Sequence, residues 1–424
     1  MRKYLKQAPP KAPRDLGRVE ETARRMIAEI ERDRDDAVRR YAVELDKWQG
    51  GDFRVSEDEI RQVASSLPET FKDDFAFCRQ QVSDFARRQR DSLQEFEVEL
   101  QPGIVLGQKL IPVAAVGCYV PGGKYPLVSA AIMSVGTARV AGVGHITACA
   151  PPRDGRSIFP PTLYALHASG ADEIYVLGGV QAMAAMAFGC VGMRRADLIT
   201  GPGNAFVAEA KRQLFGVVGL DLLAGPTEIC IIADDGADPA LVATDLLGQA
   251  EHGPDSPAWL VTTSDSVGRA VLQEVETQLR TLPTAEIAGI AWRDNGEVVV
   301  VDSDDEAIAV SDDYAPEHLE ILSSDPFALL GRIRHAGEIL LGEHTPVTLG
   351  NFVLGPNAVL PTGGAARTCS PLSVFDFMKR TSVGYVTAAG YPPLARHARV
   401  LATYEGFDGH ANAVSALRDR ARSS

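Results

Sequence analysis

The segment 239–254, PALVATDLLGQAEHGP, contains two polar residues whose spacing suits a metal site. Gln249 and His252 lie three positions apart at the end of a helical apolar pattern, directly before Gly253-Pro254. Side chains at i and i+3 share one face of a helix, so an amide oxygen and an imidazole could bind one divalent ion. An ordinary helix end remains the alternative, because a histidine cation is favourable there and glutamine is an unusual zinc ligand.

A second pair, Glu317-His318, places a carboxylate beside an imidazole, and both groups act as acids and bases in enzymes. Adjacent side chains on a strand point to opposite faces, so a shared catalytic function requires a loop here. Ala315-Pro316 directly upstream favours a loop, although a surface pair before a strand explains these residues equally well. His410, far along the chain in EGFDGHANAV, supplies a further imidazole. A metal site combined with an acid–base pair predicts an enzyme.

Two glycine-containing turns follow apolar runs, at 119–124 (YVPGGK) and at 201–204 (GPGN). Glycine at a strand-to-helix turn lets a phosphate approach the backbone N–H groups of the helix N-terminus. Neither turn has the G-x-G-x-x-G pattern, and an ordinary tight turn explains each one alone equally well. Ligands of open parallel sheets collect at the carboxyl ends of the strands, so two such turns in one series favour a nucleotide site.

Short apolar runs alternate with helical patterns from residue 111 to 216, and a second series of the same kind follows up to residue 342. This β–α repetition predicts an α/β fold with two successive parallel-sheet units, covered on both faces. An internal duplication is possible. The segments 18–48 and 56–101 have helical patterns, and residues 374–420 are also predicted to be helical.

Composition excludes several classes of protein. The chain has 424 residues, a length that indicates more than one domain. Its net charge is -14, so the chain lacks the basic surface that is typical of nucleic-acid-binding proteins. No apolar run reaches the roughly 18 residues of a membrane span. The six cysteines are scattered without a C-x-x-C pair, as is typical of reduced buried thiols. We therefore expect a cytoplasmic protein without nucleic-acid or membrane partners.

The motifs GPGNAFVAEAK, DLLAGPTEICIIAD, DLLGQAEHGPDS, APEHLEI, PNAVLPTGGAARTCS, DFMKRTSV and EGFDGHANAV occur in this order. Together they resemble histidinol dehydrogenase, from about residue 18 to the C-terminus. The resemblance implies two Rossmann-like units and small terminal domains that are exchanged between the subunits of a homodimer. It also implies a zinc-dependent enzyme that oxidises an alcohol to a carboxylate in two NAD-dependent steps.

The resemblance implies roles for individual residues at matching positions. His410 is expected to reach the metal from the partner subunit, and Thr227 stands where the family has a substrate-binding serine. The matching residues are Gln249, His252 and His410 for the metal, Glu317 and His318 for catalysis, Tyr119, Gln181 and Asn204 for NAD, and Ser129, Thr227 and Glu405 for the substrate.

Domain boundaries follow from the changes of pattern and from the resemblance. We predict an N-terminal arm (1–17), followed by a helical segment that packs on the second α/β unit (18–104). The first Rossmann-like unit, on the NAD side, spans residues 105–225, and the second, with the metal and catalytic residues, spans residues 226–360. A swapped helical tail (361–424) follows.

Three residues depart from the family pattern. Asn351 replaces an aspartate that ligates zinc, Ala358 replaces a histidine that holds the substrate, and Lys124 lies in PGGKYP where histidinol enzymes have a loop of small residues. This loop resembles branches that act on sulfonated diols. All three changes suit a substrate that is less cationic than histidinol, or anionic.

We therefore predict a metal-dependent NAD dehydrogenase that oxidises a small primary alcohol other than histidinol through an aldehyde to a carboxylate. Asn351 is expected among the metal ligands and Lys124 among the substrate contacts. Two alternatives remain open on the sequence. One is a genuine histidinol dehydrogenase of histidine biosynthesis, and the other is a non-catalytic homologue that binds a metal or a nucleotide.

Overall fold

The computed structural model describes residues 2–10, 17–122 and 125–414. They fall into a main unit, which contains the residues up to Arg90 and Val113–Phe377, and a small unit built from Asp91–Pro112 and the chain after Phe377. The predicted α/β class with two parallel sheets is confirmed. No helix in the described ranges has the length and apolar composition that crossing a membrane requires.

The first sheet of the main unit is parallel, with the strand order β6-β5-β4-β7-β8. Its strands are β4 (Ala115–Tyr119), β5 (His145–Ala150), β6 (Glu173–Val176), β7 (Leu198–Thr200) and β8 (Gly219–Leu220). The chain order reverses between β4 and β7, which is where open α/β sheets bind ligands. Gly201 has φ 123°, and a Cβ there would lie 2.1 Å from the carbonyl oxygen of Tyr119. Glycine is therefore required at this close approach.

The N-terminal helices cover the first sheet. They are α1 (Gly17–Leu45), α2 (Glu57–Ser66) and α3 (Glu69–Ser92), and the helices of the sheet itself include α6 (Pro160–Ser169), α7 (Gly179–Phe188) and α8 (Ala205–Leu214). Helix α1 packs on α7 and α8, and α2 packs on α6. The prediction that the segment 18–104 packs on the second unit is therefore wrong for α1 and α2. An amphipathic pattern identifies the buried face of a helix but not the surface that covers it.

The second sheet has the order β1-β11-β10-β9-β12-β13. Its strands are β1 (Lys3–Lys6), β9 (Ile229–Ala233), β10 (Ala258–Thr262), β11 (Gly296–Val300), β12 (His318–Leu322) and β13 (Glu338–Leu341). All pairs are parallel except that of β1 with β11, so the predicted N-terminal arm contributes an antiparallel edge strand. The five parallel strands have the same relative order as those of the first sheet, which supports an internal duplication.

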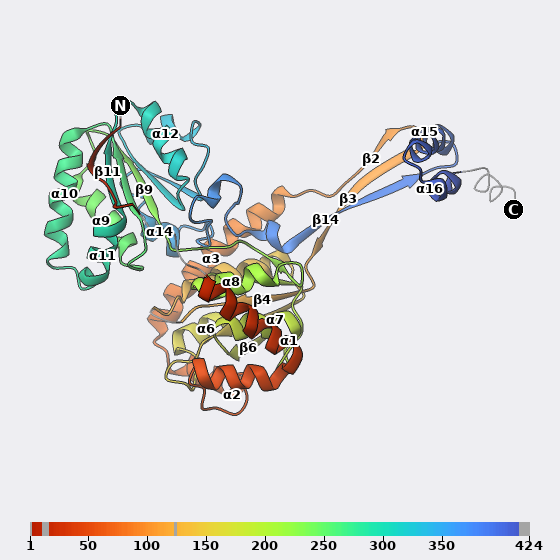
Figure 1. The fold of residues 1–424 in the computed structure, drawn as a ribbon, viewed down its shortest axis with the longest axis horizontal. Coiled ribbons are helices and arrows are strands. Elements are labelled where there is room, and N and C mark those ends of the chain that lie inside the picture. The colour runs from red at the N-terminus through yellow and green to blue at the C-terminus, as the bar shows by residue number, and fades with distance from the viewer. Residues whose placement is uncertain (1, 11–16, 123–124, 415–424) are drawn as a thin grey trace. The chain divides into compact units, whose positions relative to one another are not determined.

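Helices cover both faces of the second sheet. Those labelled α9 (Pro239–Ala250), α10 (Asp265–Leu279) and α11 (Ala285–Asn295) lie on one face, and α12 (Asp304–Tyr314) lies on the other (Figure 1). Ile229 and Ile231 of β9 enter the core under the first group, whereas Cys230 and Ile232 enter the core under α12. Successive side chains of a strand point to opposite faces, so a continuous apolar run is needed here. Burial of each such isoleucine contributes about 1.5–3 kcal/mol.

The small unit is an antiparallel sheet of order β14-β3-β2 followed by two helices (Figure 1). Its elements are β2 (Phe96–Gln101), β3 (Ile104–Pro112), β14 (Met378–Val386), α15 (Tyr391–Tyr404) and α16 (Asp408–Ala413). The helical predictions for 96–101 and 378–386 are therefore wrong. Strand β14 pairs with β3, from Met378 opposite Pro112 to Val386 opposite Ile104. Local periodicity does not reveal a partner so distant in sequence.

Candidate active site

The Glu317-His318 pair lies at the amino edge of the second sheet. Helix α12 ends at Tyr314, its C-cap residue Ala315 has φ 48°, and His318 is the first residue of β12. Glu317 thus belongs to the loop and His318 to the strand, so their side chains need not point to opposite faces. Nε2 of His318 lies 4.0 Å from Oε2 of Glu317, and both side chains are buried. The loop that a shared function requires is present.

Thr227 connects Glu317 to Gln249. Oε2 of Glu317 accepts hydrogen bonds from the Thr227 hydroxyl and, at 2.9 Å, from the backbone N–H of Glu228. The same hydroxyl accepts a hydrogen bond from Nε2 of Gln249. These residues come from the end of α9 and from the loops before β9 and β12, which meet at the amino edge of the sheet. The expected substrate residue therefore links the expected catalytic carboxylate to an expected metal ligand.

Burial displaces the protonation equilibria of this cluster. It raises the pKa of Glu317, although the nearby His318 and the Thr227 hydrogen bond oppose the shift. Burial alone would lower the pKa of His318, but the charge of Glu317 and a hydrogen bond with Glu338 raise it overall. Burial, together with the charge of Glu317, raises the pKa of Glu228 to about 7. Buried acids and bases whose pKa values are shifted in this way are typical of acid–base catalysis.

His252 and Asn351 line one cavity together with Ser129. The cavity has a volume of about 520 Å³ and lies within the main unit, with Phe71 and Phe75 of α3 in its wall. Desolvation lowers the pKa of His252. A neutral imidazole is the form that binds metals.

The residues present fit a metal ion. Oε1 of Gln249 is buried and has no hydrogen-bond partner among the described residues, although buried amide oxygens are nearly always paired. A role of this oxygen as a metal ligand would explain why it has no partner among the described residues. In the described ranges no three His, Cys, Asp or Glu residues gather at a metal-binding distance.

The residues expected to contact NAD lie at the carboxyl edge of the first sheet. Tyr119 ends β4, and its hydroxyl accepts the backbone N–H of Gly179 at 3.2 Å. Gln181 is buried in the first turn of α7 and donates from Nε2 to Asp46 at 2.9 Å. Asn204 is exposed and caps α8 by accepting N–H groups through Oδ1. All three surround the strand-order reversal, where α/β sheets bind nucleotides.

The carboxyl edge of the first sheet faces the amino edge of the second. The loop that follows β4 lines the same cavity as the end of α9, and the Tyr125 hydroxyl donates to the Glu251 carbonyl oxygen at 3.4 Å. This juxtaposition brings the residues expected to contact the nucleotide toward those expected to contact the metal.

Two of the predicted site residues belong to the small unit, and a third lies outside the described residues. Glu405 and His410 belong to the small unit, where both are exposed and His410 lies beside Phe407, with a ring separation of 5.2 Å. Lys124 lies outside the described residues.

Sequence reasoning missed a buried ion pair that supports the GPGN turn. Lys211 of α8 forms an ion pair with Asp221 and donates to the carbonyl oxygens of Gly201 at 3.0 Å and Leu222 at 2.7 Å. Asp221 accepts the Thr200 hydroxyl at 2.7 Å and the Gly201 N–H at 3.0 Å. Both charged side chains are almost fully buried. The contacts join segments before and after α8, and no local pattern predicts them.

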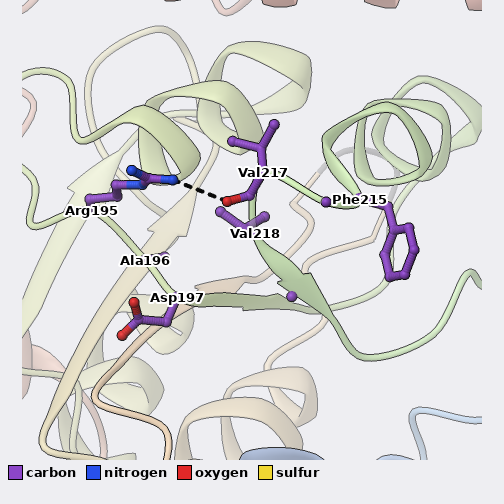
Figure 2. A pocket seen from close by; sticks show the side chains of 8 residues that line it. Arg195, Ala196, Asp197, Phe215, Val217 and Val218 are labelled. Carbon is purple, nitrogen blue, oxygen red and sulfur yellow. Dashed lines mark hydrogen bonds between the residues drawn. The ribbon is translucent and has the colours of Figure 1, made fainter. Parts of the chain in front are cut away.

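A second pocket, of about 480 Å³, lies at the amino edge of the first sheet, where β7 and β8 begin. Figure 2 shows Arg195 donating to the carbonyl oxygen of Val217, at 3.1 Å, beside Asp197 and Phe215. None of the predicted site residues lines it. Its position is opposite to the edge that carries Tyr119, so it does not serve the predicted nucleotide site.

Residues 10–418 match the family model of histidinol dehydrogenase. The chain belongs to this family. It is 47% identical over 422 residues to a histidinol dehydrogenase homolog of Shouchella clausii, covering 99% of both chains. It is 44% identical to the sulfopropanediol 3-dehydrogenase of Ruegeria pomeroyi over 413 residues, covering 97% of this chain and 95% of the relative.

The fold agrees with this membership. The crystal structure of histidinol dehydrogenase from Elizabethkingia anophelis superposes with a TM-score of 0.91 at 34% identity, covering 99% of this chain and 95% of that one. Histidinol dehydrogenase family members are NAD-dependent alcohol dehydrogenases, and this chain is an oxidoreductase of the family.

Proposed function

We propose that this enzyme oxidises a small primary alcohol other than histidinol through the aldehyde to the carboxylate, using two NAD and a divalent metal, zinc. The observation that carries the proposal is the hydrogen-bonded chain from Gln249 through Thr227 to Glu317, next to His318. It couples a prospective metal ligand to a buried acid–base pair. In addition, Gln249 has an unpartnered oxygen that fits a metal.

His318 acts as the base in the first oxidation and removes the proton of the substrate hydroxyl at Nε2. When bound, the metal would polarise this hydroxyl, and NAD would accept the hydride. A positioned base contributes about 10²–10⁴-fold to the rate. The neighbouring carboxylates favour the protonated imidazole, as the raised pKa of His318 indicates, and so stabilise the base after it has taken the proton.

Glu317 acts in the second oxidation by removing a proton from the water that adds to the aldehyde. The Thr227 hydroxyl and the Glu228 N–H orient Oε2 for this step. When bound, NAD would accept the second hydride. In total, alcohol, water and two NAD⁺ give carboxylate, two NADH and three protons. Retention of the aldehyde in a closed site prevents its loss between the steps.

The lining of the 520 Å³ cavity supports an alcohol that is not histidinol. Asn351 carries no charge that would attract a cationic substrate, and aromatic side chains (Phe71, Phe75 and Phe352) form part of the wall. Ala358 has no polar side chain where the family resemblance predicts a substrate-binding histidine. The similarity to a sulfopropanediol 3-dehydrogenase also favours a different alcohol.

The proposal includes a homodimer in which the small unit completes the partner's site. Helix α15 has no buried residue, and a helix with an apolar stripe normally buries it. Large apolar side chains of the small unit are exposed, namely Leu100, Tyr385, Val400, Leu401, Tyr404 and Phe407. Exposed apolar clusters favour protein contacts. All six cysteines are free, which supports a cytoplasmic location.

The test is the stoichiometry of the reaction with a panel of diols, amino alcohols and hydroxylated anions, with L-histidinol included. We expect two NADH per alcohol and a carboxylate product. One NADH and a stable aldehyde would reject the second oxidation, and efficient turnover of histidinol would reject the substrate class. The Glu317→Gln variant is assayed in parallel with the alcohol and with the aldehyde. We expect the substitution to impair oxidation of the aldehyde more strongly than oxidation of the alcohol. Equal impairment of both steps would reject the role of Glu317.

A further inference from the structure

Glu338 lies beside His318 on the neighbouring strand. The two residues begin β13 and β12 and are paired directly in the register of these parallel strands. Oε2 of Glu338 lies 3.3 Å from Nδ1 of His318, and the side chains are 7% and 2% exposed. We propose that Glu338 is a positioning residue that accepts the Nδ1–H of His318 and thereby presents Nε2 to the substrate hydroxyl.

The consequence of this contact is a single tautomer. A neutral imidazole carries one N–H, and a carboxylate at Nδ1 holds the proton there, so Nε2 keeps its lone pair. Nε2 is the nitrogen closer to Glu317, at 4.0 Å. The inference rests on the proposed function, because only a base that acts through Nε2 benefits from this arrangement. Carboxylates orient catalytic imidazoles in the same way in other enzymes.

Two further observations indicate that this carboxylate serves His318. Within the described ranges, no other side chain hydrogen-bonds or ion-pairs with Glu338, and its Oε1 is buried without a partner. A buried carboxylate without a cation is unfavourable, and protonation of His318 during turnover would supply the missing charge.

Gly350 leaves the space that the Glu338 carboxylate occupies. A Cβ at Gly350 would lie 2.6 Å from Oε2 of Glu338, which is the oxygen that contacts His318. Even an alanine would therefore force this carboxylate to move. The local backbone thus holds the carboxylate close to the imidazole, and Gly350→Ala offers a second, independent way to disturb the pair.

The experiment compares Glu338→Leu and Glu338→Gln with the wild-type holoenzyme, using the alcohol found by the panel. Leucine removes the acceptor, and kcat should fall about 10²–10⁴-fold, the contribution of the base itself. Because the proposed role of Glu338 is exerted through His318, KM should stay within about threefold. Glutamine keeps an acceptor oxygen and should retain more activity than leucine. Gly350→Ala should lower kcat in the same direction. Glu343→Gln, at an exposed acid, is the matched control and should be neutral.

A spectroscopic readout separates tautomer control from general structural damage. In protein labelled with ¹⁵N-histidine, the His318 signals are assigned by their loss in His318→Ala. We expect the Nδ1–H tautomer in the wild type and a mixture or the Nε2–H form in Glu338→Leu. Unchanged signals together with wild-type kcat in Glu338→Leu would overturn the proposal. If this variant does not fold, wild-type kcat in Gly350→Ala overturns it, because an added Cβ there would displace the Glu338 carboxylate. Full activity of His318→Ala would instead reject the proposed function.

Discussion

The hydroxyl of Thr227 donates a hydrogen bond to Oε2 of Glu317. Because the same hydroxyl accepts a hydrogen bond from Gln249, the orientation of the proposed catalytic carboxylate depends on the residue expected to bind the metal. Oε1 of Gln249 is left without a partner in the described ranges. A ligand on this oxygen would fix the amide, and the amide would in turn fix Thr227 and Glu317.

Thr227→Val tests this coupling. Valine keeps the shape but leaves both Glu317 and Gln249 without the partner that Thr227 provides. The unpaired groups should cost about 1–3 kcal/mol of transition-state stabilisation, or roughly ten- to a hundred-fold in kcat/KM. Thr227→Ser retains the hydroxyl and should stay close to the wild type. If valine and serine behave alike in steady-state kinetics, the hydroxyl does not couple these residues.

Asn351→Asp should strengthen metal binding. Asn351 and His252 line the same cavity, and a carboxylate binds a divalent cation more strongly than a neutral amide does. The measurement is the metal content that survives dialysis against a chelator, determined by elemental analysis. Gln273→Glu adds the same charge at an exposed position and should change nothing. Weaker retention in Asn351→Asp would show that residue 351 is not a ligand.

Lys211→Met should destabilise the main unit and weaken NAD binding. The substitution leaves Asp221 as a buried charge without its cation, at a cost of about 3–5 kcal/mol. It also releases the Gly201 carbonyl oxygen. Thermal unfolding and NAD titration measure the two effects. The double variant with Asp221→Asn should regain part of the stability. Arg212→Met, at an exposed ion pair, should change stability by less than about 1 kcal/mol.

Stability should fall as the pH rises through the titration of Glu228. Its pKa is raised to about 7 from an ordinary value of 4.5. Between these values the folded state binds more protons than the unfolded state, so rising pH favours unfolding. The difference between the two pKa values corresponds to about 3 kcal/mol of unfolding free energy. Glu228→Gln removes this penalty. The unfolding temperature of the variant should therefore rise relative to that of the wild type as the pH increases from 5 to 8. A constant difference would contradict the raised pKa.

Complementation tests the proposed dimer. His318→Ala and His410→Ala should each be nearly inactive. When the two chains are unfolded and refolded together, heterodimers should regain activity, because one composite site would contain His318 from one chain and His410 from the other. Heterodimers that form but stay inactive would place both residues in the same chain's site.

Much of the main unit could be predicted from local pattern. The alternation of apolar runs and helices indicated two parallel sheets, because buried parallel strands need continuous apolar segments. The shared helix face predicted for Gln249 and His252 is not formed, because α9 ends at Ala250 and His252 lies in the turn that follows. Glu317-His318 after Ala315-Pro316 indicated a loop, and the structure has that loop. These features depend on neighbouring residues, so a single sequence contains them.

Tertiary structure alone decided the other relationships. The pairing of β14 with β3, the packing of α1 on α7 and the approach of Glu338 to His318 all join segments that are distant in the chain. From the sequence alone, Glu338 looks like an ordinary acidic residue at the start of an apolar strand. It reaches His318 because β13 pairs with β12 in one register, and a shift by one residue would point it to the other face. Local periodicity determines which face of an element is buried, whereas the partner of that face is determined by the packing of the whole chain.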